Sequence, residues 1–326
     1  MNDAVPFPTI VLTRLAALGL DTGAILARAG IDHVELPRAK LTTAQFFALW
    51  DAVERAAPGR DFGLVLGAGA IAHRYDMASM VATHAANVRD ALAKYAKYKH
   101  LICPEDVFVE AKGREARIRF HWTLADSEPP RMLVDGTFAA VHSLVRHGTR
   151  KDVRPIRLEL ARRKADVRLL EAHFGCPLVF DAPVDVFVLD VAALAEPFVT
   201  HDAALLAELV PGLDAELARE GRTLADEVRL ALARRMCGER PSLGQVAADL
   251  RVSVRTLQRR LGEAGTSYQR LLDDVRADSA RRLLARTNLE PSEVAFVLGF
   301  EEYNSFTRAF HAWEGTTPTK YRALAE

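Results

Sequence analysis

The last third of the chain repeats one pattern of apolar and polar residues, and this repeat restricts the fold more than any other feature. Each copy contains a short amphipathic stretch, a turn and a second helical stretch, over residues 242–263 and again over residues 292–313. A short helix joined by a tight turn to a second helix is the helix-turn-helix motif. We therefore predict an all-α domain over residues 223–326 that contains two such units.

The first copy begins with a serine that can cap a helix. Ser242 precedes Val246 and Ala247, and Ala247 is small enough for a close helix crossing. After a turn at Arg251-Val252, a second capped helix begins, and its inward residues are expected to be Val254, Leu257 and Leu261, with Ser253 as the cap. Its outward residues are Arg255, Thr256, Gln258 and Arg259. Arginine can form two hydrogen bonds with guanine and glutamine two with adenine, so this helix is predicted to read DNA.

The second copy has the same order of residue types. Ser292 is expected to cap a helix that buries Val294 and Ala295, and Gly299 follows where a positive φ is needed. The core residues after the turn are predicted to be Phe300, Phe306 and Phe310, the last two on a helix over residues 302–313. The outward residues of that helix are Tyr303, Asn304, Thr307 and Arg308. Glu301 and Glu302 would repel phosphate, which leaves open whether this unit reads bases or only contacts the backbone.

A long amphipathic stretch, Tyr268 to Ala285, separates the two copies and is expected to be one helix. At 1.5 Å per residue it would span roughly 27 Å. Successive major grooves on one face of DNA are about 34 Å apart. A linker helix of this length could therefore place the two reading helices in neighbouring grooves.

The whole C-terminal pattern resembles the AraC/XylS family of bacterial transcription regulators from about Arg222 to the end. The resemblance rests on the segments AFVLGF (295–300), FTRAF (306–310), GTTPTKYR (315–322) and SVRTLQR (253–259). It implies that the outer faces of both second helices bind DNA. The residues expected to form the scaffold of the two units are Ala247, Ser253, Leu257, Gly299, Phe300, Phe310 and Pro318.

The first two thirds of the chain predict an α+β domain over residues 1–212. Thr42 and Gln45 form a capping-box pattern, and a helix is expected over residues 87–100. From Glu105 the apolar residues alternate, which predicts a hairpin with one buried face. Pro211-Gly212 is expected to end the last helical pattern, so residues 213–222 are predicted to be a linker. Segments 15–20, 92–98 and 174–180 resemble the arabinose-binding-type effector and dimerisation domain of one branch of the same family.

Composition sets limits on partners and on location. The chain has 43 basic and 43 acidic residues, but from Glu227 onward there are 16 basic and 13 acidic residues, and all but one of the basic ones are arginine. The cysteines Cys103, Cys176 and Cys237 form no CxxC pair, which fits a reducing compartment. We expect a cytoplasmic protein with no signal peptide and no membrane partner.

Nothing in the sequence predicts catalysis, a metal site or a cofactor. The ten histidines have no ligand-like spacing, and no nucleophile stands in an activating pattern. Ile118, Phe120 and Trp122 could line a ligand cavity or could equally be plain sheet core. The residues that would bind an effector are not identified by the sequence.

We therefore predict a transcription regulator that binds double-stranded promoter DNA and responds to a small-molecule effector. A homodimer is expected, as is a contact with RNA polymerase if the protein activates transcription. Two alternatives stay open at this point. One is an architectural DNA-binding protein without an effector, and the other is an enzyme whose helical tail docks a partner.

Overall fold

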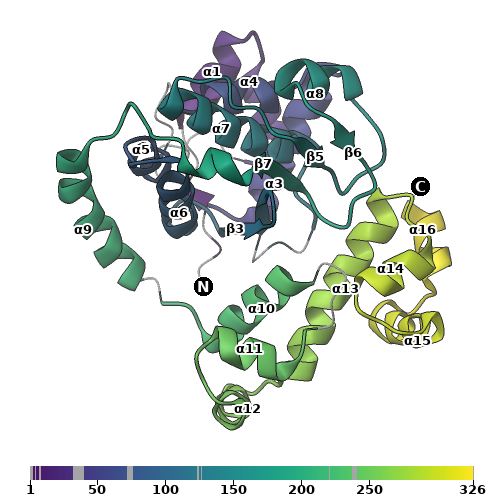
Figure 1. Cartoon of the computed structure of the whole chain (residues 1–326). Coiled ribbons are helices and arrows are strands. Elements are labelled where there is room, and N and C mark those ends of the chain that lie inside the picture. The colour runs from purple at the N-terminus through teal and green to yellow at the C-terminus, as the bar shows by residue number, and fades with distance from the viewer. Residues whose placement is uncertain are drawn as a thin grey trace.

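The computed structural model describes residues 3, 5–6, 9–31, 40–71, 76–122, 125, 127–219, 221–236 and 241–325. It contains an α+β N-terminal domain and an all-α C-terminal domain, as predicted, and Figure 1 shows the second below and to the right of the first. Cys237 and residues 238–240 lie outside the described residues. Cys103 and Cys176 are buried free thiols.

The N-terminal domain begins with a two-stranded ribbon and a group of helices. Strand β1 (Val5–Pro6) pairs antiparallel with β2 (Lys40–Leu41). The helices up to the sheet are α1 (Thr9–Ala17), α2 (Thr22–Arg28), α3 (Thr43–Ala56), α4 (Phe62–Gly69), α5 (Met77–Thr83), α6 (Val88–Tyr98) and η1 (Lys99–Leu101). The predicted capping box at Thr42 and Gln45 is confirmed at the start of α3.

A five-stranded sheet forms the rest of this domain together with four helical segments. The strand order is β3-β4-β7-β5-β6, and all neighbours are antiparallel except β5 and β6. The strands are β3 (Glu105–Lys112), β4 (Glu115–Trp122), β5 (Arg157–Glu159), β6 (Leu178–Val179) and β7 (Val186–Asp190). The helical segments are α7 (Arg131–Thr149), α8 (Val167–Phe174), η2 (Val191–Ala195) and α9 (Ala203–Arg219).

Helix α7 covers one face of the sheet and packs closely against α4. Phe138 of α7 lies 5.8 Å from Phe187 of β7, measured between ring centroids. A Cβ added at Gly67 would stand 2.1 Å from the carbonyl oxygen of Gly136, so the two backbones approach too closely for any side chain at that point. Gly67 and Gly136 therefore allow α4 and α7 to cross at close range. Helix α7 in turn packs its apolar side against the sheet.

The other face of the hairpin is also covered, which corrects the expectation of a single buried face. Phe108 and Arg119 lie opposite each other in the β3–β4 register, and both are buried. The C-terminal domain covers them: Arg119 Nη2 donates to the carbonyl oxygen of Arg234 at 2.7 Å, and the Arg234 guanidinium lies 5.0 Å from the centre of the Phe108 ring. An alternating pattern shows two faces but cannot show that a second domain buries the polar one.

The expected helix end at Pro211-Gly212 is wrong, because α9 continues through both residues to Arg219. Proline inside a helix removes one backbone hydrogen bond. Contacts of α9 with the core compensate, since Leu206, Leu209 and Leu213 pack against it. Residues 213–219, predicted as linker, are therefore helical, and only residues 220–223 separate α9 from the next helix.

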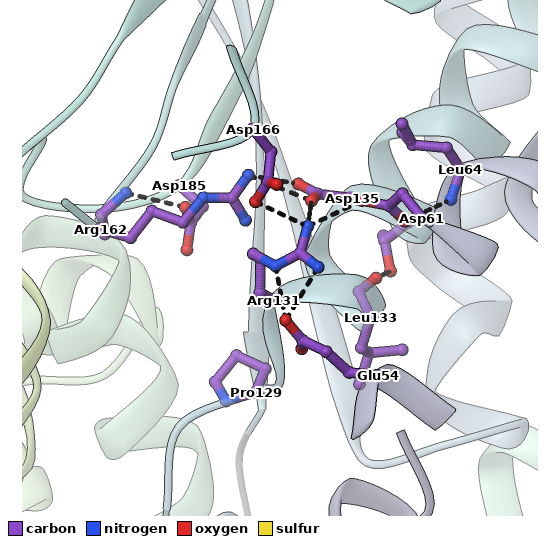
Figure 2. Close-up of polar contacts among 12 residues, drawn as sticks. Glu54, Asp61, Leu64, Pro129, Arg131, Leu133, Asp135, Arg162, Asp166 and Asp185 are labelled. Carbon is purple, nitrogen blue, oxygen red and sulfur yellow. Dashed lines mark hydrogen bonds and ion pairs between the residues drawn. The ribbon is translucent and has the colours of Figure 1, made fainter. Parts of the chain in front are cut away.

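An ion-pair cluster ties α3, α4, α7 and the segment before α8 together (Figure 2). The Arg131 guanidinium donates to Glu54 Oε1 and Asp61 Oδ2, both at 2.9 Å. One turn further along α7, the fully buried Asp135 accepts two hydrogen bonds from Arg162 Nη2, at 2.8 and 3.1 Å. Burial raises the pKa of Asp135 to about 7, and Arg162 opposes that rise.

The C-terminal domain is two small helical cores joined by one helix. Its helices are α10 (Leu224–Arg235), α11 (Leu243–Asp249), α12 (Val254–Glu263), α13 (Tyr268–Arg286), α14 (Pro291–Val297), α15 (Tyr303–Glu314) and α16 (Pro318–Ala325). The first part of α13 places Leu271 and Leu272 in one core, and its last part places Leu283 and Leu284 in the other. The predicted linker helix is thus confirmed, and it contributes side chains to the cores of both units.

Candidate DNA-binding surface

The first helix-turn-helix unit consists of α11 and α12. Ser242 and Gln245 form a capping box at the start of α11, and Ser253 Oγ accepts from the Thr256 N–H at the start of α12. Val246 and Ala247 of α11 are buried together with Leu257 and Leu261 of α12, as predicted. These contacts fix α12 relative to α11 and α13.

The turn between α11 and α12 contains a strained residue. Arg251 has a φ of 54°, in the left-handed region that disfavours any side chain. The turn closes through two backbone bonds, from the Arg251 N–H to Ala248 at 3.0 Å and from the Val252 N–H to Ala247 at 3.0 Å. This is the Schellman pattern that ends many helices.

The solvent side of α12 carries three of the four side chains that were predicted to read bases from this helix. Arg255, Gln258 and Arg259 are all exposed. Arg259 Nη1 pairs with Glu263 Oε1 one turn on, at 2.5 Å. Both side chains are about 60% exposed, so the pair is weak and Arg259 can exchange Glu263 for another partner. Thr256 is half-buried and its hydroxyl lies 2.8 Å from Ser253 Oγ, which makes it part of the cap. Val254, expected inside, is 40% exposed.

The second unit, α14 and α15, repeats the first in its backbone. Gly299 has a φ of 74°, as predicted, and stands where Arg251 stands in the first unit. The same two bonds close the turn, from the Gly299 N–H to Phe296 at 2.9 Å and from the Phe300 N–H to Ala295 at 3.0 Å. The sequence repeat therefore corresponds to a repeat of hydrogen bonds.

Ser292 is not the cap of α14, which corrects that expectation. The cap residue is Glu290, whose N–H donates to Glu293 Oε2 at 2.7 Å. Pro291 occupies the first helical position, where its fixed φ suits a helix and its missing N–H has no cost. The proline moves the helix start two residues earlier than a serine cap would place it.

The solvent side of α15 is more mixed in charge than that of α12. Asn304 and Arg308 are exposed, and Tyr303 is 39% exposed with its ring against Phe306. Thr307 is half-buried and its hydroxyl donates to the Tyr303 carbonyl oxygen at 3.1 Å. Exposed Glu301 and Glu302 directly precede this helix. A phosphate near the start of α15 would therefore meet two carboxylates.

A buried arginine supports the second unit, and sequence reasoning missed it. Arg276 of α13 is 4% exposed, and its guanidinium donates to the carbonyl oxygens of Leu298 and Gly299 at 3.0 and 3.1 Å. The same group lies 4.4 Å from the centre of the Phe300 ring. Arg276 is spaced four residues from both Leu272 and Ala280 on the apolar side of α13, and that spacing is the signal that could have identified it.

The remaining predicted scaffold residues lie where the sequence placed them. Phe310 is fully buried, and Phe300 is half-buried with its ring 5.5 Å from Phe306. Pro318 is the buried first residue of α16. Arg322 of α16 donates from Nε to the Leu284 carbonyl oxygen at 3.2 Å, so α16 is bonded to the end of α13.

The C-terminal domain contacts the N-terminal domain through α10 and α13, which leaves the outer sides of α12 and α15 uncovered (Figure 1). Arg286 Nη1 of α13 donates to the Pro129 carbonyl oxygen at 2.8 Å. Arg222, just before α10, pairs with Asp106 of β3. In Figure 1, α12 and α15 both lie on the side away from the N-terminal domain. The exposed side chains of both helices are therefore accessible to a partner.

Comparison with known proteins gives two family matches that together cover most of the chain. Residues 19–198 match the arabinose-binding domain of AraC transcription regulators, and residues 246–324 match a helix-turn-helix domain. The chain belongs to the AraC family of transcription regulators. The AraC-type DNA-binding domain is the one that holds α11 to α15, and the chain is a DNA-binding regulator rather than an enzyme.

Several relatives align with this AraC-type regulator over nearly its whole length. The ornithine utilization regulator of Pseudomonas aeruginosa is 28% identical over 98% of this chain and 95% of its own. The regulator VirS of Mycobacterium tuberculosis is 26% identical over 90% of this chain and 87% of its own. The crystal structure of the regulator CdpR from Pseudomonas aeruginosa is similar with a TM-score of 0.42, at 25% identity over 92% of this chain and 96% of that one.

Within the residues that the structure describes, no helix is long and apolar enough to cross a membrane. Within the same ranges, no three histidine, cysteine, aspartate or glutamate side chains are grouped so that they could hold a metal ion.

Proposed function

We propose that this AraC-type regulator reads promoter DNA with the outer faces of α12 and α15, and that a small molecule bound by the N-terminal domain alters this binding. The observation that carries the proposal is the open face of α12, where Arg255, Gln258 and Arg259 project from a helix fixed by its neighbours. The full set of proposed DNA contacts is Arg255, Thr256, Gln258, Arg259, Tyr303, Asn304, Thr307 and Arg308.

The two faces are proposed to contribute differently. The α12 face carries two arginines and a glutamine, which can bind base edges. The α15 face offers Asn304 and Arg308 but follows two carboxylates. We therefore assign most base discrimination to α12 and mainly positioning to α15. Helix α13 has 19 residues, and its length of about 28 Å supports contacts in neighbouring major grooves.

The proposed partners follow from this proposed function. They are double-stranded promoter DNA, a small-molecule effector, a second copy of the chain and, if the protein activates transcription, RNA polymerase. One relative is named for ornithine utilization, so ornithine is the first effector to test. Light scattering of the purified chain with and without DNA tests the dimer.

The decisive experiment selects DNA fragments from a random pool and then measures their affinity for variants. Arg259→Ala should weaken the selected site by about 1–3 kcal/mol and relax the preference at one base pair. Arg219→Ala, an exposed arginine at the end of α9, is the matched control and should leave affinity unchanged. Affinity should also fall steeply with salt. If Arg259→Ala and Arg219→Ala bind alike, the assignment of α12 is wrong.

An effector test separates the proposal from an architectural role. A regulator with an effector must bind DNA with different affinity in the presence of that effector. A DNA-binding protein whose affinity no compound changes, across a broad panel that includes ornithine, would be architectural.

A further inference from the structure

A cavity of about 430 Å³ lies inside the N-terminal domain. It is bounded by β1, α3, α4, α7 and the carboxyl end of α9. Its walls are mostly apolar, and the largest aromatic side chains on them are Phe46, Trp50, Tyr95 and Trp122. A volume of this size is typical of sites for small molecules.

The sequence suggested Ile118, Phe120 and Trp122 as residues that could line a ligand cavity. Of the three residues that could have lined a cavity, Trp122 lines this one, and Phe120 lines a separate, smaller hollow of about 120 Å³. Ile118 is fully buried in the core, and the ring of Phe120 packs 6.1 Å from Phe138. The rest of the wall comes from several elements between β1 and α9 that are distant from one another in sequence.

One hydrogen-bond donor on the cavity wall has no partner among the residues that the structure describes. Trp50 is 9% exposed, and its indole Nε1 is shielded from solvent without an acceptor. Trp122 on the same wall differs, because its side chain is hydrogen-bonded to Glu105. Buried donors are normally paired, so we take the unpaired Trp50 N–H as a donor for a ligand's acceptor. Because the nitrogen has almost no accessible surface, that acceptor reaches it only after a neighbouring side chain moves aside.

The charges around the cavity disfavour an organic anion. Lys99 lines it, but Lys99 Nζ is paired with Glu105 Oε2 at 3.2 Å, and both side chains are largely buried. Asp76 and Glu216 also line the cavity. Burial raises the pKa of the Cys103 thiol to about 12, so this wall group is neutral. A carboxylate ligand would meet more acidic than basic groups, and a cation would lose its water among apolar walls.

The helix that closes the cavity leads directly to the DNA-binding domain. Leu213 and Glu216 of α9 line the cavity. Between them, Asp214 accepts from the Tyr98 hydroxyl at 2.7 Å and pairs with Lys97 Nζ at 2.6 Å, which holds α9 on α6. Helix α9 ends at Arg219, and Thr223 caps α10.

We propose that this cavity binds a neutral, mainly apolar molecule whose carbonyl oxygen accepts the Trp50 indole N–H, and that its occupancy acts on the DNA-binding domain through α9. The proposal rests on the effector function proposed above and names the ligand class and the site for it. Ornithine, which is charged and polar, does not belong to that class.

The first test is direct binding of a neutral ketone to the full chain. The probe is 6-propionyl-2-(dimethylamino)naphthalene, whose fluorescence shifts to the blue in apolar surroundings. We expect one probe per chain. Trp50→Phe keeps an aromatic side chain, although a smaller one, and removes the donor, and should weaken binding about tenfold. Ala140→Phe should fill the cavity and abolish binding. Trp313→Phe, in the DNA-binding domain, is the matched control and should bind as the wild type does.

Competition tests the ligand class with a ketone and a carboxylate that share a phenylalkyl skeleton, and with ornithine. 4-Phenyl-2-butanone should displace the probe, whereas 3-phenylpropionate and ornithine at the same concentration should not. Better displacement by 3-phenylpropionate or by ornithine would overturn the neutral class. Equal probe affinity of Trp50→Phe and the wild type would overturn the role of Trp50, and unchanged binding by Ala140→Phe would overturn the site.

DNA affinity measured with and without saturating probe separates this inference from the function on which it rests. A changed affinity in the wild type that is lost in Ala140→Phe supports both. Probe binding that depends on Trp50 but leaves DNA affinity unchanged overturns coupling through α9 and leaves the cavity as a binding site. If some other compound changes DNA affinity equally in the wild type and Ala140→Phe, the effector function stands and this cavity is not its site.

Discussion

Arg163 closes the carboxyl end of α13, because its backbone N–H donates to the carbonyl oxygen of Arg286 at 2.7 Å. Its guanidinium also donates to the Ala285 carbonyl oxygen at 3.2 Å. The last carbonyl groups of a helix have no partners within that helix. Arg163 lies between β5 and α8, so the N-terminal domain completes the hydrogen bonding of the helix that joins the two DNA-binding units.

Substitution of Arg163 tests this contact between the domains. Arg163→Ala keeps the backbone bond but removes the guanidinium bonds to Ala285 and to Asn288 Oδ1. We expect a loss of about 1–2 kcal/mol in the free energy of unfolding, measured by urea denaturation. Lys112→Ala, an exposed residue at the end of β3, is the control. Equal midpoints for both variants would contradict a stabilising role for the guanidinium.

Glu263 is expected to compete with DNA for Arg259, with which it forms an ion pair. Because the Arg259–Glu263 pair is exposed, its own contribution to stability is small. Glu263→Gln frees the arginine, so we expect DNA affinity to rise about two- to fivefold in gel-shift titrations with unchanged stability. The double variant with Arg259→Ala decides the cause. If Glu263→Gln helps equally when Arg259 is absent, the gain comes from removing a negative charge and not from freeing Arg259.

The two turns are predicted to respond in opposite ways to exchange of their central residues. Arg251 and Gly299 occupy equivalent left-handed positions with φ of 54° and 74°. Arg251→Gly should stabilise the first unit by about 0.5–1 kcal/mol, and Gly299→Val should destabilise the second by about 1–2 kcal/mol, since a β-branched residue resists positive φ. Thermal unfolding measures both. A stabilising Gly299→Val would mean that the turn adopts another conformation.

The difference between these two turns shows what the sequence can and cannot predict. The positive φ of Gly299 is predictable because glycine at the end of a helix commonly adopts the left-handed conformation. Arg251 gives no such signal, yet the repeated pattern around it still placed the turn correctly. Long-range contacts were not predicted: Arg276 reaches a turn 22 residues away, and Arg119 reaches the other domain. Periodicity identifies the face on which a residue lies but not what covers that face.

Arg276 is expected to be essential for the second unit. It is buried and bonded to two carbonyl oxygens of the α14–α15 turn. Arg276→Gln shortens the side chain and leaves those carbonyl groups unpaired, which should cost about 2–4 kcal/mol and weaken DNA binding through α15. Arg270→Gln, an exposed arginine on the same helix, is the control. The measurement is unfolding of the intact chain, and stability equal to that of the control would refute the assignment.

His121 is expected to make the contact between the domains sensitive to acid. Its ring stacks on Phe108 with centroids 6.3 Å apart, beneath the C-terminal domain. Burial, together with the positive charges of Arg282 and Arg119, lowers the pKa of His121 to about 4 against the opposing charge of Asp106. In the unfolded chain a histidine titrates near 6.5. The folded state therefore binds fewer protons than the unfolded state between these two pKa values.

The sign of the effect follows from that difference in bound protons. The stabilisation is fully present above pH 6.5 and is lost as the pH falls toward 4. From pH 7.5 to pH 5 the loss attributable to His121 should be about 1–2 kcal/mol. His121→Phe keeps a ring against Phe108 but cannot bind a proton, so its stability should fall less over the same range. Urea denaturation at both pH values measures this. His142, whose pKa burial also lowers to about 4, is present in both proteins and contributes a similar loss to each, so it does not affect the comparison. If His121→Phe loses as much stability as the wild type, protonation of His121 does not weaken the contact between the domains.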